Sequence, residues 1–294
     1  MDDRSSLYVV HSRPELDQPV LVMSPDGWID AGLGGATALG ALVDGIETEV
    51  VATFDADELL DHRARRPTAR IVDGVYDDLI WPEIELRAGH DAQGQAVLLL
   101  VGPEPDHQWR AYAEAVGELA TSFDVSLLVG MGAFPAPVPH TRPGSLAATA
   151  TTAELAESVG VVSGTLEVPA GVLVAVERRF AEIGIPAVGL WARVPHYAAA
   201  MPYPEASLLI LQGLAKVGGV VVDTAELGDA ADATRQRLDD LTANSAEHSA
   251  LVRQLEARAD AEADEGLAAS GWENLPTADE LGAEVERFLE GEGT

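Results

Sequence analysis

Short runs of β-branched and aliphatic residues alternate along this chain with longer segments of helical periodicity, and this alternation restricts the fold more than any other feature. The strand-like runs lie at residues 19–24, 49–54, 96–102, 125–132 and 187–194. Helical patterns lie at 32–44, 105–122, 169–184 and 204–217, the last three with proline at or near their first position. Such alternation predicts an α/β fold in which helices cover both faces of one sheet.

One pair of strand-like runs is expected to form an antiparallel hairpin. Residues 80–101 read IWPEIELRAGHDAQGQAVLLLV, in which two apolar runs flank the turn-rich residues 89–95. The other connections are long enough to hold crossover helices. The predicted fold class is therefore α/β, with a mixed sheet flanked by helices.

The composition changes near residue 224, where the strand signals stop. Residues 225–294 hold 18 acidic residues and five arginines. One helical stripe is expected within residues 234–263, formed by Leu238, Leu241, Ser245, His248, Val252 and Leu255. It must pack on the main domain or on a neighbouring subunit. We therefore expect an α/β core domain, residues 1–224, and an acidic helical appendage, residues 225–294, in which a capping box at Thr277 and Glu280 predicts a further helix.

The charge balance argues against several classes of partner. Lys and Arg number 18 against 49 Asp and Glu, a net charge of −31, so the surface repels nucleic-acid phosphates and anionic lipids. No apolar run has the length of a signal peptide or a membrane span, which predicts a cytoplasmic protein. The chain has no cysteine, which removes disulfides, thiolate nucleophiles and iron–sulfur clusters. No cofactor and no metal are expected.

A glycine-rich turn at residues 25–35 lies between a strand and a helix, where nucleotide-binding folds place their phosphate loop. It lacks the Gly-Lys-Ser/Thr of a P-loop and does not complete the dinucleotide fingerprint. The favoured interpretation is a tight turn with close backbone packing, in which Asp30 caps or orients the loop. The alternative is a ligand-facing loop with Asp26 or Asp30 as acid/base groups.

Residues 102–109, GPEPDHQW, form a second strand-to-helix junction. Glu104, Asp106 and His107 combine carboxylates with an imidazole at short spacing, which suits acid/base work or metal binding. Such a junction also needs polar residues for capping, and Asp106 is placed to cap the next helix. Capping is the preferred interpretation, and Glu104 stays a candidate acid/base group.

Two loops at the ends of predicted strands carry the most reactive side chains. The loop at 130–143 contains four prolines in nine positions, and the loop at 191–197 follows another strand. If they are neighbours, their cations and phenol form one rim suited to an anionic ligand. The alternative is that the arginines pair with the abundant carboxylates and the histidines fill hydrogen-bond gaps. The candidate residues are His140, Arg142, Arg193, His196 and Tyr197.

The signatures of several enzyme classes are missing. The sequence has no Gly-x-Ser-x-Gly elbow, no His-Glu-x-x-His and no Ser-x-x-Lys, and its one lysine is Lys216 on an apolar helix. Serine-hydrolase, zinc-protease, Schiff-base and P-loop chemistry therefore lack their usual residues. These absences favour a protein without catalytic activity.

Six segments of the chain carry a family resemblance: GWIDAG (27–32), DHRARRP (61–67), GPEPDHQW (102–109), MGAFPAPVPHTRP (131–143), GLWARVPHYAAAMPYPEASLLIL (189–211) and PTADELGAEVERFLEG (276–291). Together they resemble the proteasome assembly chaperone 2 family as it occurs in actinobacteria. The resemblance covers nearly the whole chain and implies a fold like that of nucleoside phosphorylases. It also implies protein partners, because archaeal and eukaryotic relatives act as chaperones that help proteasome rings to assemble.

The chain departs from that family at its last residues. Relatives that dock onto proteasome α-rings often finish with a hydrophobic residue, a tyrosine and one further residue, whereas this sequence finishes Gly-Glu-Gly-Thr at 291–294. Docking by that tail is therefore not expected.

Two hypotheses of function follow. The first is a non-enzymatic assembly-chaperone-like protein that binds other proteins, proteasome components among them. It would form a homo-oligomer through its appendage, a trimer by analogy with phosphorylases. Its acidic surface would favour a basic partner. The second is a phosphorylase- or hydrolase-like enzyme that acts on a small anionic or nucleoside ligand at the loops 130–143 and 191–197.

Overall fold

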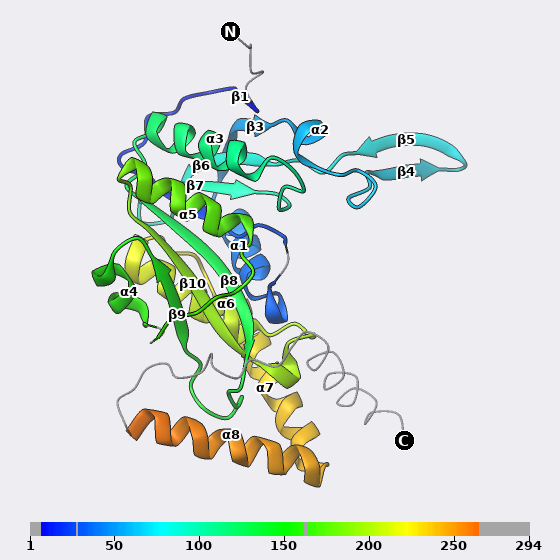
Figure 1. The fold of residues 1–294 in the computed structure, drawn as a ribbon. Coiled ribbons are helices and arrows are strands. Elements are labelled where there is room, and N and C mark those ends of the chain that lie inside the picture. Colours follow the sequence, from blue (N-terminus) through cyan, green and yellow to red (C-terminus); the bar gives the residue numbers. More distant parts are fainter. Residues whose placement is uncertain (1–6, 28, 162–163, 265–294) are drawn as a thin grey trace.

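The computed structural model describes residues 7–27, 29–161 and 164–264 (Figure 1). The main sheet has eight strands in the order β1-β3-β6-β7-β2-β8-β10-β9. Their bounds are Tyr8–Val10 (β1), Val20–Met23 (β2), Thr48–Phe54 (β3), Glu85–His90 (β6), Ala96–Val101 (β7), Leu127–Ala136 (β8), Leu146–Ala150 (β9) and Ala187–Pro195 (β10).

The sheet is mixed, as the sequence predicted. Strands β7, β2, β8 and β10 form a parallel centre, and the strands outside them pair antiparallel. The expected hairpin is present, since β6 pairs antiparallel with β7 and His90 lies opposite Ala96. Strand β8 continues to Ala136, further into the proline-rich segment than residues 125–132 indicated.

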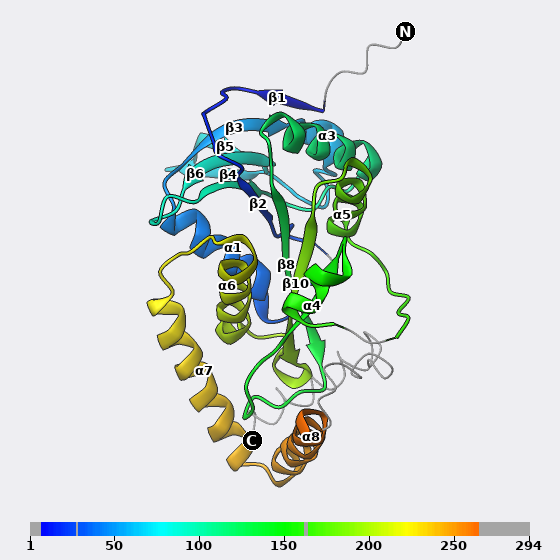
Figure 2. The same ribbon diagram turned by 90° about the vertical axis from the view of Figure 1, so that its left-hand side faces the viewer.

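Helices cover both faces of this sheet. They are η1 (Ala31–Leu33), α1 (Gly34–Gly45), α2 (Ala56–Leu59), α3 (Trp109–Ser122), α4 (Ala153–Val159), α5 (Val172–Ile183), η2 (His196–Ala198), α6 (Pro204–Gly218), α7 (Ala225–Ala243) and α8 (Ala246–Asp264). In Figure 2 the central strands separate α1 and α6 from α3 and α5. The α/β class and its helix-covered mixed sheet are thereby confirmed.

The central strands are apolar along their whole length because each face meets a helical layer. In β2, Val20 and Val22 belong to the cluster that includes α1 and α6, whereas Leu21 and Met23 belong to the cluster that includes α3 and α5. All four residues are buried. This burial on both faces explains why the strand reads as a continuous hydrophobic run.

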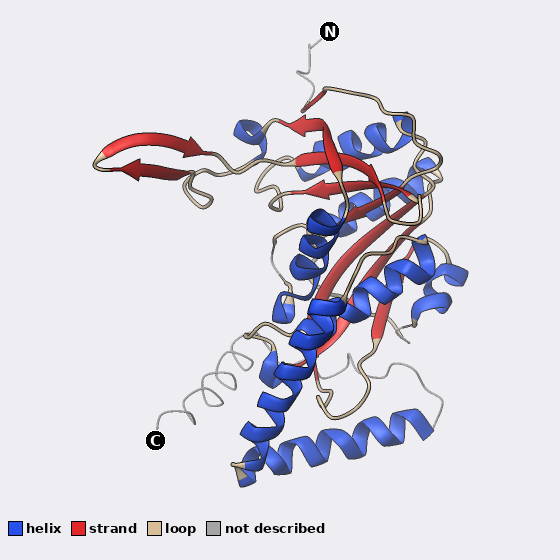
Figure 3. Ribbon diagram, turned by 180° about the vertical axis from the view of Figure 1, so that it is seen from behind, coloured by secondary structure: helices blue, strands red, loops and turns tan. Residues whose placement is uncertain are grey.

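The appendage differs from the single helical stripe that its spacing predicted. Helix α7 ends at Ala243 and α8 begins at Ala246, and the chain turns between them so that the two helices run in clearly different directions (Figure 3). The side-chain oxygen of Ser245 accepts a hydrogen bond from the His248 N–H at 3.3 Å, as an N-cap does, and this local cap starts a new helix. The second helix predicted from Thr277 lies outside the described residues.

The stripe nevertheless packs on its own chain. Leu238 of α7 and Val252 and Leu255 of α8 are buried in the cluster that contains α6. The stripe therefore packs on the main domain and not on a neighbouring subunit, because these three side chains are already buried within their own chain.

A second sheet was not expected from the sequence. Strands β4 (Thr68–Val72) and β5 (Val75–Ile80) form a hairpin that projects away from the body (Figure 1). Asp73 and Gly74 make its turn with φ of 49° and 82°, the positive values that a type I′ turn requires. All residues of both strands are exposed. We refer to residues 68–81 as the arm.

The packing of α7 gives a first prediction. Leu238 is fully buried, so Leu238→Ala should lower the free energy of unfolding by about 2–5 kcal/mol. Urea unfolding of the full chain, followed by circular dichroism, measures this change. Leu241→Ala, at a half-buried position of the same helix, serves as the control and should cost less. Equal, small effects of both substitutions would show that α7 does not contribute to the core.

Candidate functional site

The two segments singled out from the sequence meet at one end of the sheet, but they are not loops throughout. Residues 191–195 belong to β10, His196 and Tyr197 to η2, and residues 130–136 to β8. Strands β8 and β10 are parallel neighbours whose last paired residues are Ala136 and Pro195, so the segments that follow them start side by side. His140 and Tyr197 are both buried and in contact. We call His140, Arg142, Arg193, His196 and Tyr197 the rim.

His140 and Tyr197 form a fixed hydrogen-bonded pair. The backbone N–H of His140 donates to the Tyr197 hydroxyl oxygen at 2.9 Å, and the same hydroxyl lies 2.6 Å from Nδ1. A hydroxyl that accepts from the N–H can donate its own proton to Nδ1, which leaves the ring proton on Nε2. That nitrogen lies 3.3 Å from Oδ1 of Asp239 in α7. Both ring nitrogens are therefore engaged.

Burial decides the charge state of this pair. It lowers the pKa of His140, against the opposing effect of the Asp239 carboxylate, and it raises the pKa of Tyr197. Both side chains are therefore neutral at pH 7. A neutral imidazole held between a phenol and a carboxylate acts as a structural link from the loop to α7. The enzymatic alternative remains a prediction.

Arg142 joins the same loop to α8. Its Nε and Nη2 atoms donate to the two carboxylate oxygens of Asp260 at 2.7 and 2.9 Å, and its Nη1 donates to Glu256 at 3.1 Å. The hydroxyl of Thr141 also donates to Glu256, at 2.6 Å. The hydrogen bonds from Arg142 lower the pKa of Asp260, which stays ionised.

Arg193 and His196 complete the rim. Burial lowers the pKa of Arg193, and the negative charge of Glu262 in α8 opposes the shift. His196 is buried, with Nδ1 3.4 Å from the carbonyl oxygen of Ala136 and its ring against Tyr197. The structure thus brings the five candidates to one end of the sheet. The carboxylates that face them come from α7 and α8, with Glu205 of α6 near His140 as well.

Asp26, Asp30 and Glu104 make local hydrogen bonds at the connections between strands and helices. Asp30 accepts from the N–H groups of Gly35 and Ala36 at 2.8 Å each, which matches the capping interpretation. Burial raises the pKa of Asp30 above its ordinary value, and the hydrogen bonds from those N–H groups only partly oppose this shift. The backbone of Asp26 pairs with that of Glu104 across the bridge to Pro103, and the Glu104 carboxylate accepts from Val172 N–H at 2.6 Å, where α5 begins.

The capping role assigned to Asp106 is wrong. Helix α3 begins at Trp109, four residues after the start that was predicted, and Gln108 precedes it in the left-handed conformation without a side-chain cap. The Asp106 carboxylate accepts from Asp61 N–H at 2.8 Å and lies 3.4 Å from Nε of Arg65. It holds the segment before the arm instead of capping the helix.

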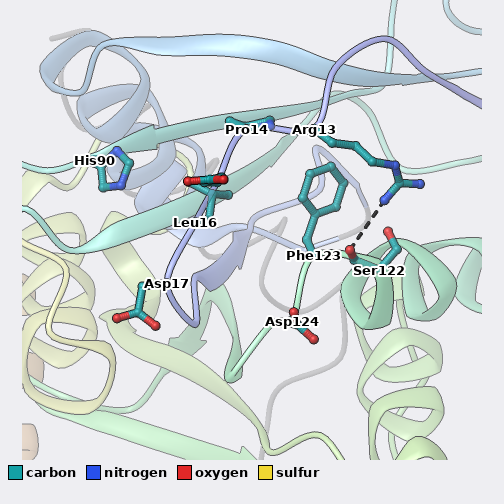
Figure 4. Close-up of a pocket in the computed structure, with 9 residues that line it drawn as sticks. Arg13, Pro14, Leu16, Asp17, His90, Ser122, Phe123 and Asp124 are labelled. Atoms are coloured by element: carbon teal, nitrogen blue, oxygen red, sulfur yellow. Dashed lines mark hydrogen bonds between the residues drawn. The ribbon is translucent and has the colours of Figure 1, made fainter.

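A hollow lies away from the rim, near the starts of β2 and β8 (Figure 4). It measures about 520 Å³ and is lined by residues 13–17, by His90 and by residues 122–124. Arg13 donates to the Ser122 carbonyl at 3.4 Å and lies 5.4 Å from the centre of the Phe123 ring. None of these residues belongs to a motif that stands out in the sequence.

The described residues hold neither a metal-binding cluster nor a membrane-spanning helix. No group of three or more His, Asp or Glu side chains in the ranges above is arranged to hold a metal ion. No helix within the same ranges has the length and hydrophobicity to cross a membrane.

The fold and the rim define an α/β protein with a mixed eight-stranded sheet and a polar loop cluster where two of its parallel strands end. The chain belongs to the PAC2 family, whose model matches residues 26–242. The family resemblance drawn from the sequence is confirmed.

Solved structures agree. Rv2714 of Mycobacterium tuberculosis, a protein of unknown function, is 32% identical over 97% of this chain and 98% of its own, with a TM-score of 0.82. Rv2125 of the same organism, a proteasome-assembly chaperone homologue, is 30% identical over 79% and 99%, with a TM-score of 0.73. PbaB of Pyrococcus furiosus, an archaeal proteasome activator, shares the fold at 17% identity over 80% and 97%, with a TM-score of 0.61. Comparison with curated proteins gives no match.

One buried carboxyl lies apart from the rim. Glu177 of α5 is 8% exposed, and both carboxylate oxygens lie 3.2 Å from the hydroxyl of Thr149 in β9. Burial raises its pKa to about 7, and the hydrogen bond from Thr149 only partly opposes this. The carboxyl is therefore protonated in the folded protein at a pH where the unfolded chain has already lost that proton.

This shift gives a second prediction. The folded-state pKa exceeds the ordinary value of 4.5, so the stability that Glu177 contributes is complete below pH 4.5 and is lost as the pH rises towards 7. Glu177→Gln should therefore raise the melting temperature at pH 8 and change it little at pH 4. Calorimetry at both values tests this, with Glu182→Gln on the exposed side of α5 as the control. An equal shift at both pH values would contradict the assignment.

Proposed function

We propose that this protein acts by binding other protein chains, as an assembly-chaperone-like member of its family, and that the arm is its main contact surface. The exposed apolar face of the arm carries this proposal. Support also comes from the proteasome-assembly chaperone homologue at 30% identity. More specifically, we propose that its partners take part in proteasome assembly.

The arm has one face that is entirely apolar. Paired residues of a hairpin point to the same side, and so do residues two apart along one strand. Ala69 pairs with Leu79 and Ile71 with Tyr76, so these four side chains share a face. The other face carries the Arg70–Asp77 ion pair at 3.1 Å.

The exposure of this face is unusual for a soluble chain. Tyr76 is 79% and Ile71 56% exposed, and seven of the twelve large hydrophobic residues exposed in the described ranges lie at 71–81. An isolated two-stranded hairpin is only marginally stable in water. A concentrated apolar patch of this kind is typical of a protein–protein contact.

The base of the arm adds positive charge. Arg63 and Arg66 are exposed, and the exposed Trp81 packs edge-on against His62, with ring centres 4.9 Å apart. Cations beside an aromatic side chain, on a protein of net charge −31, favour an acidic contact surface on the partner. A second copy of this chain offers such a surface. We therefore place the expected homo-oligomer at the arm, because the appendage stripe is used within its own chain.

A variant of the arm tests this proposal. Ile71→Ser, Tyr76→Ser and Leu79→Ser together remove the large side chains of the apolar face without touching a buried residue. We expect the full-length variant to keep its melting temperature and to sediment at a lower mass than the wild type. Proteins that the wild type captures from lysate should be lost as well.

The control removes apolar side chains elsewhere. Leu166 and Val168 are 40% and 52% exposed and lie outside the arm. Leu166→Ser with Val168→Ser should sediment and capture partners as the wild type does. If the arm variant keeps both the mass and the partners of the wild type, the arm is not the contact surface.

A further inference from the structure

Helix α8 contacts the rim through its carboxylates. Glu256 and Asp260 lie four residues apart on one side of α8, and both bind Arg142. The negative charge of Glu262, on the same helix, favours the charged form of Arg193 and so raises its pKa against the effect of burial. The cationic surface expected to suit an anionic ligand is thus occupied by carboxylates of the same chain.

Helix α8 is held to the main domain less directly than α7. Helix α7 packs along α6, whereas the main packing partner of α8 is α7 itself. The buried apolar contacts of α8 are Val252 and Leu255. The side chains of Arg142 and Asp260 are 35% and 56% exposed, and ion pairs with such access to water stabilise only slightly and weaken as salt increases. Helix α7 is joined to α8 by the short link at Asn244 and Ser245, and the contact of α7 with His140 through Asp239 does not involve α8.

We propose that α8 is a displaceable cover and that the surface beneath it binds an acidic amphipathic helix of another protein. The side chains that α8 places on this surface define the ligand. They are two apolar residues three apart, Val252 and Leu255, followed by the carboxylates Glu256 and Asp260. A partner helix with this pattern would take the same contacts with Arg142 and Thr141, and a further carboxylate at the position of Glu262 would face Arg193.

This surface is separate from the arm, so the two proposals can fail independently. The rim lies where the parallel strands end beside α7 and α8, while the arm projects from the other end of the body (Figure 1). The arm variant described above should therefore bind a helix at the rim as the wild type does.

A peptide with the sequence of α8, residues 246–264, is the probe. Fluorescein-labelled AEHSALVRQLEARADAEAD is titrated with the full chain, and its anisotropy is measured. Glu256→Gln with Asp260→Asn in the protein weakens the cover, so a larger fraction of molecules exposes the surface. We expect this variant to bind the peptide about tenfold more tightly than the wild type. Arg142→Gln with Arg193→Gln, added to it, should abolish binding.

Two controls isolate the carboxylates. Asp240→Asn with Glu247→Gln removes the same charge from exposed positions on α7 and α8 and should leave the affinity unchanged. A peptide in which the residues equivalent to Glu256 and Asp260 are neutral should not bind. The proposal is overturned if the neutral peptide binds equally well, or if the cover variant binds no more tightly than the charge control.

Displacement of α8 has a direct readout, because the chain contains no cysteine. Leu255→Cys places a thiol under α8, and Leu214→Cys places one in the core beneath α6. We expect the Leu255→Cys thiol to react with a maleimide faster than the Leu214→Cys thiol, and faster still at high salt. Equal rates, independent of salt, would show that α8 opens only when the whole protein unfolds.

Discussion

The burial of four parallel strands on both faces is the constraint on which the rest of the molecule depends. A slip of one residue in β2 would exchange Val20 and Val22 with Leu21 and Met23 and place each pair in the wrong layer. The register is therefore fixed along the centre of the sheet. Because β8 and β10 are held in that register, they end side by side at Ala136 and Pro195. The segments that carry the rim residues therefore lie next to each other.

In a chain with 18 Lys and Arg against 49 Asp and Glu, the positions of the cations are more informative than those of the carboxylates. Two groups stand out, one at residues 62–66 beside the arm and one at the rim. The first group includes exposed arginines, whereas Arg142 in the second is held by carboxylates 114 and 118 residues further along the chain. The acidic appendage therefore does more than add solubility, since it supplies the counter-charges of the rim.

Periodicity predicted the parts of the fold where burial alternates or is continuous, such as the strand at 19–24 and the hairpin around 89–95. It failed at residues 244–245, because the spacing of apolar residues continues in phase across the turn between α7 and α8. The arm had a signal in Asp73-Gly74, but no sequence pattern shows that both faces of a hairpin stay in water. The loop candidates met as expected, yet Asp239 could not be foreseen as the partner of His140, since nothing in the sequence connects residues 99 positions apart.

The separation of the arm from the core has a consequence for the sequences that the fold tolerates. None of its strand residues is buried, so substitutions there disturb no packing and carry little penalty in folding. The sheet, by contrast, tolerates few changes. Packing therefore constrains the sequence of the sheet strongly and that of the arm hardly at all, so sequence changes in the arm are expected to leave the fold of the body intact.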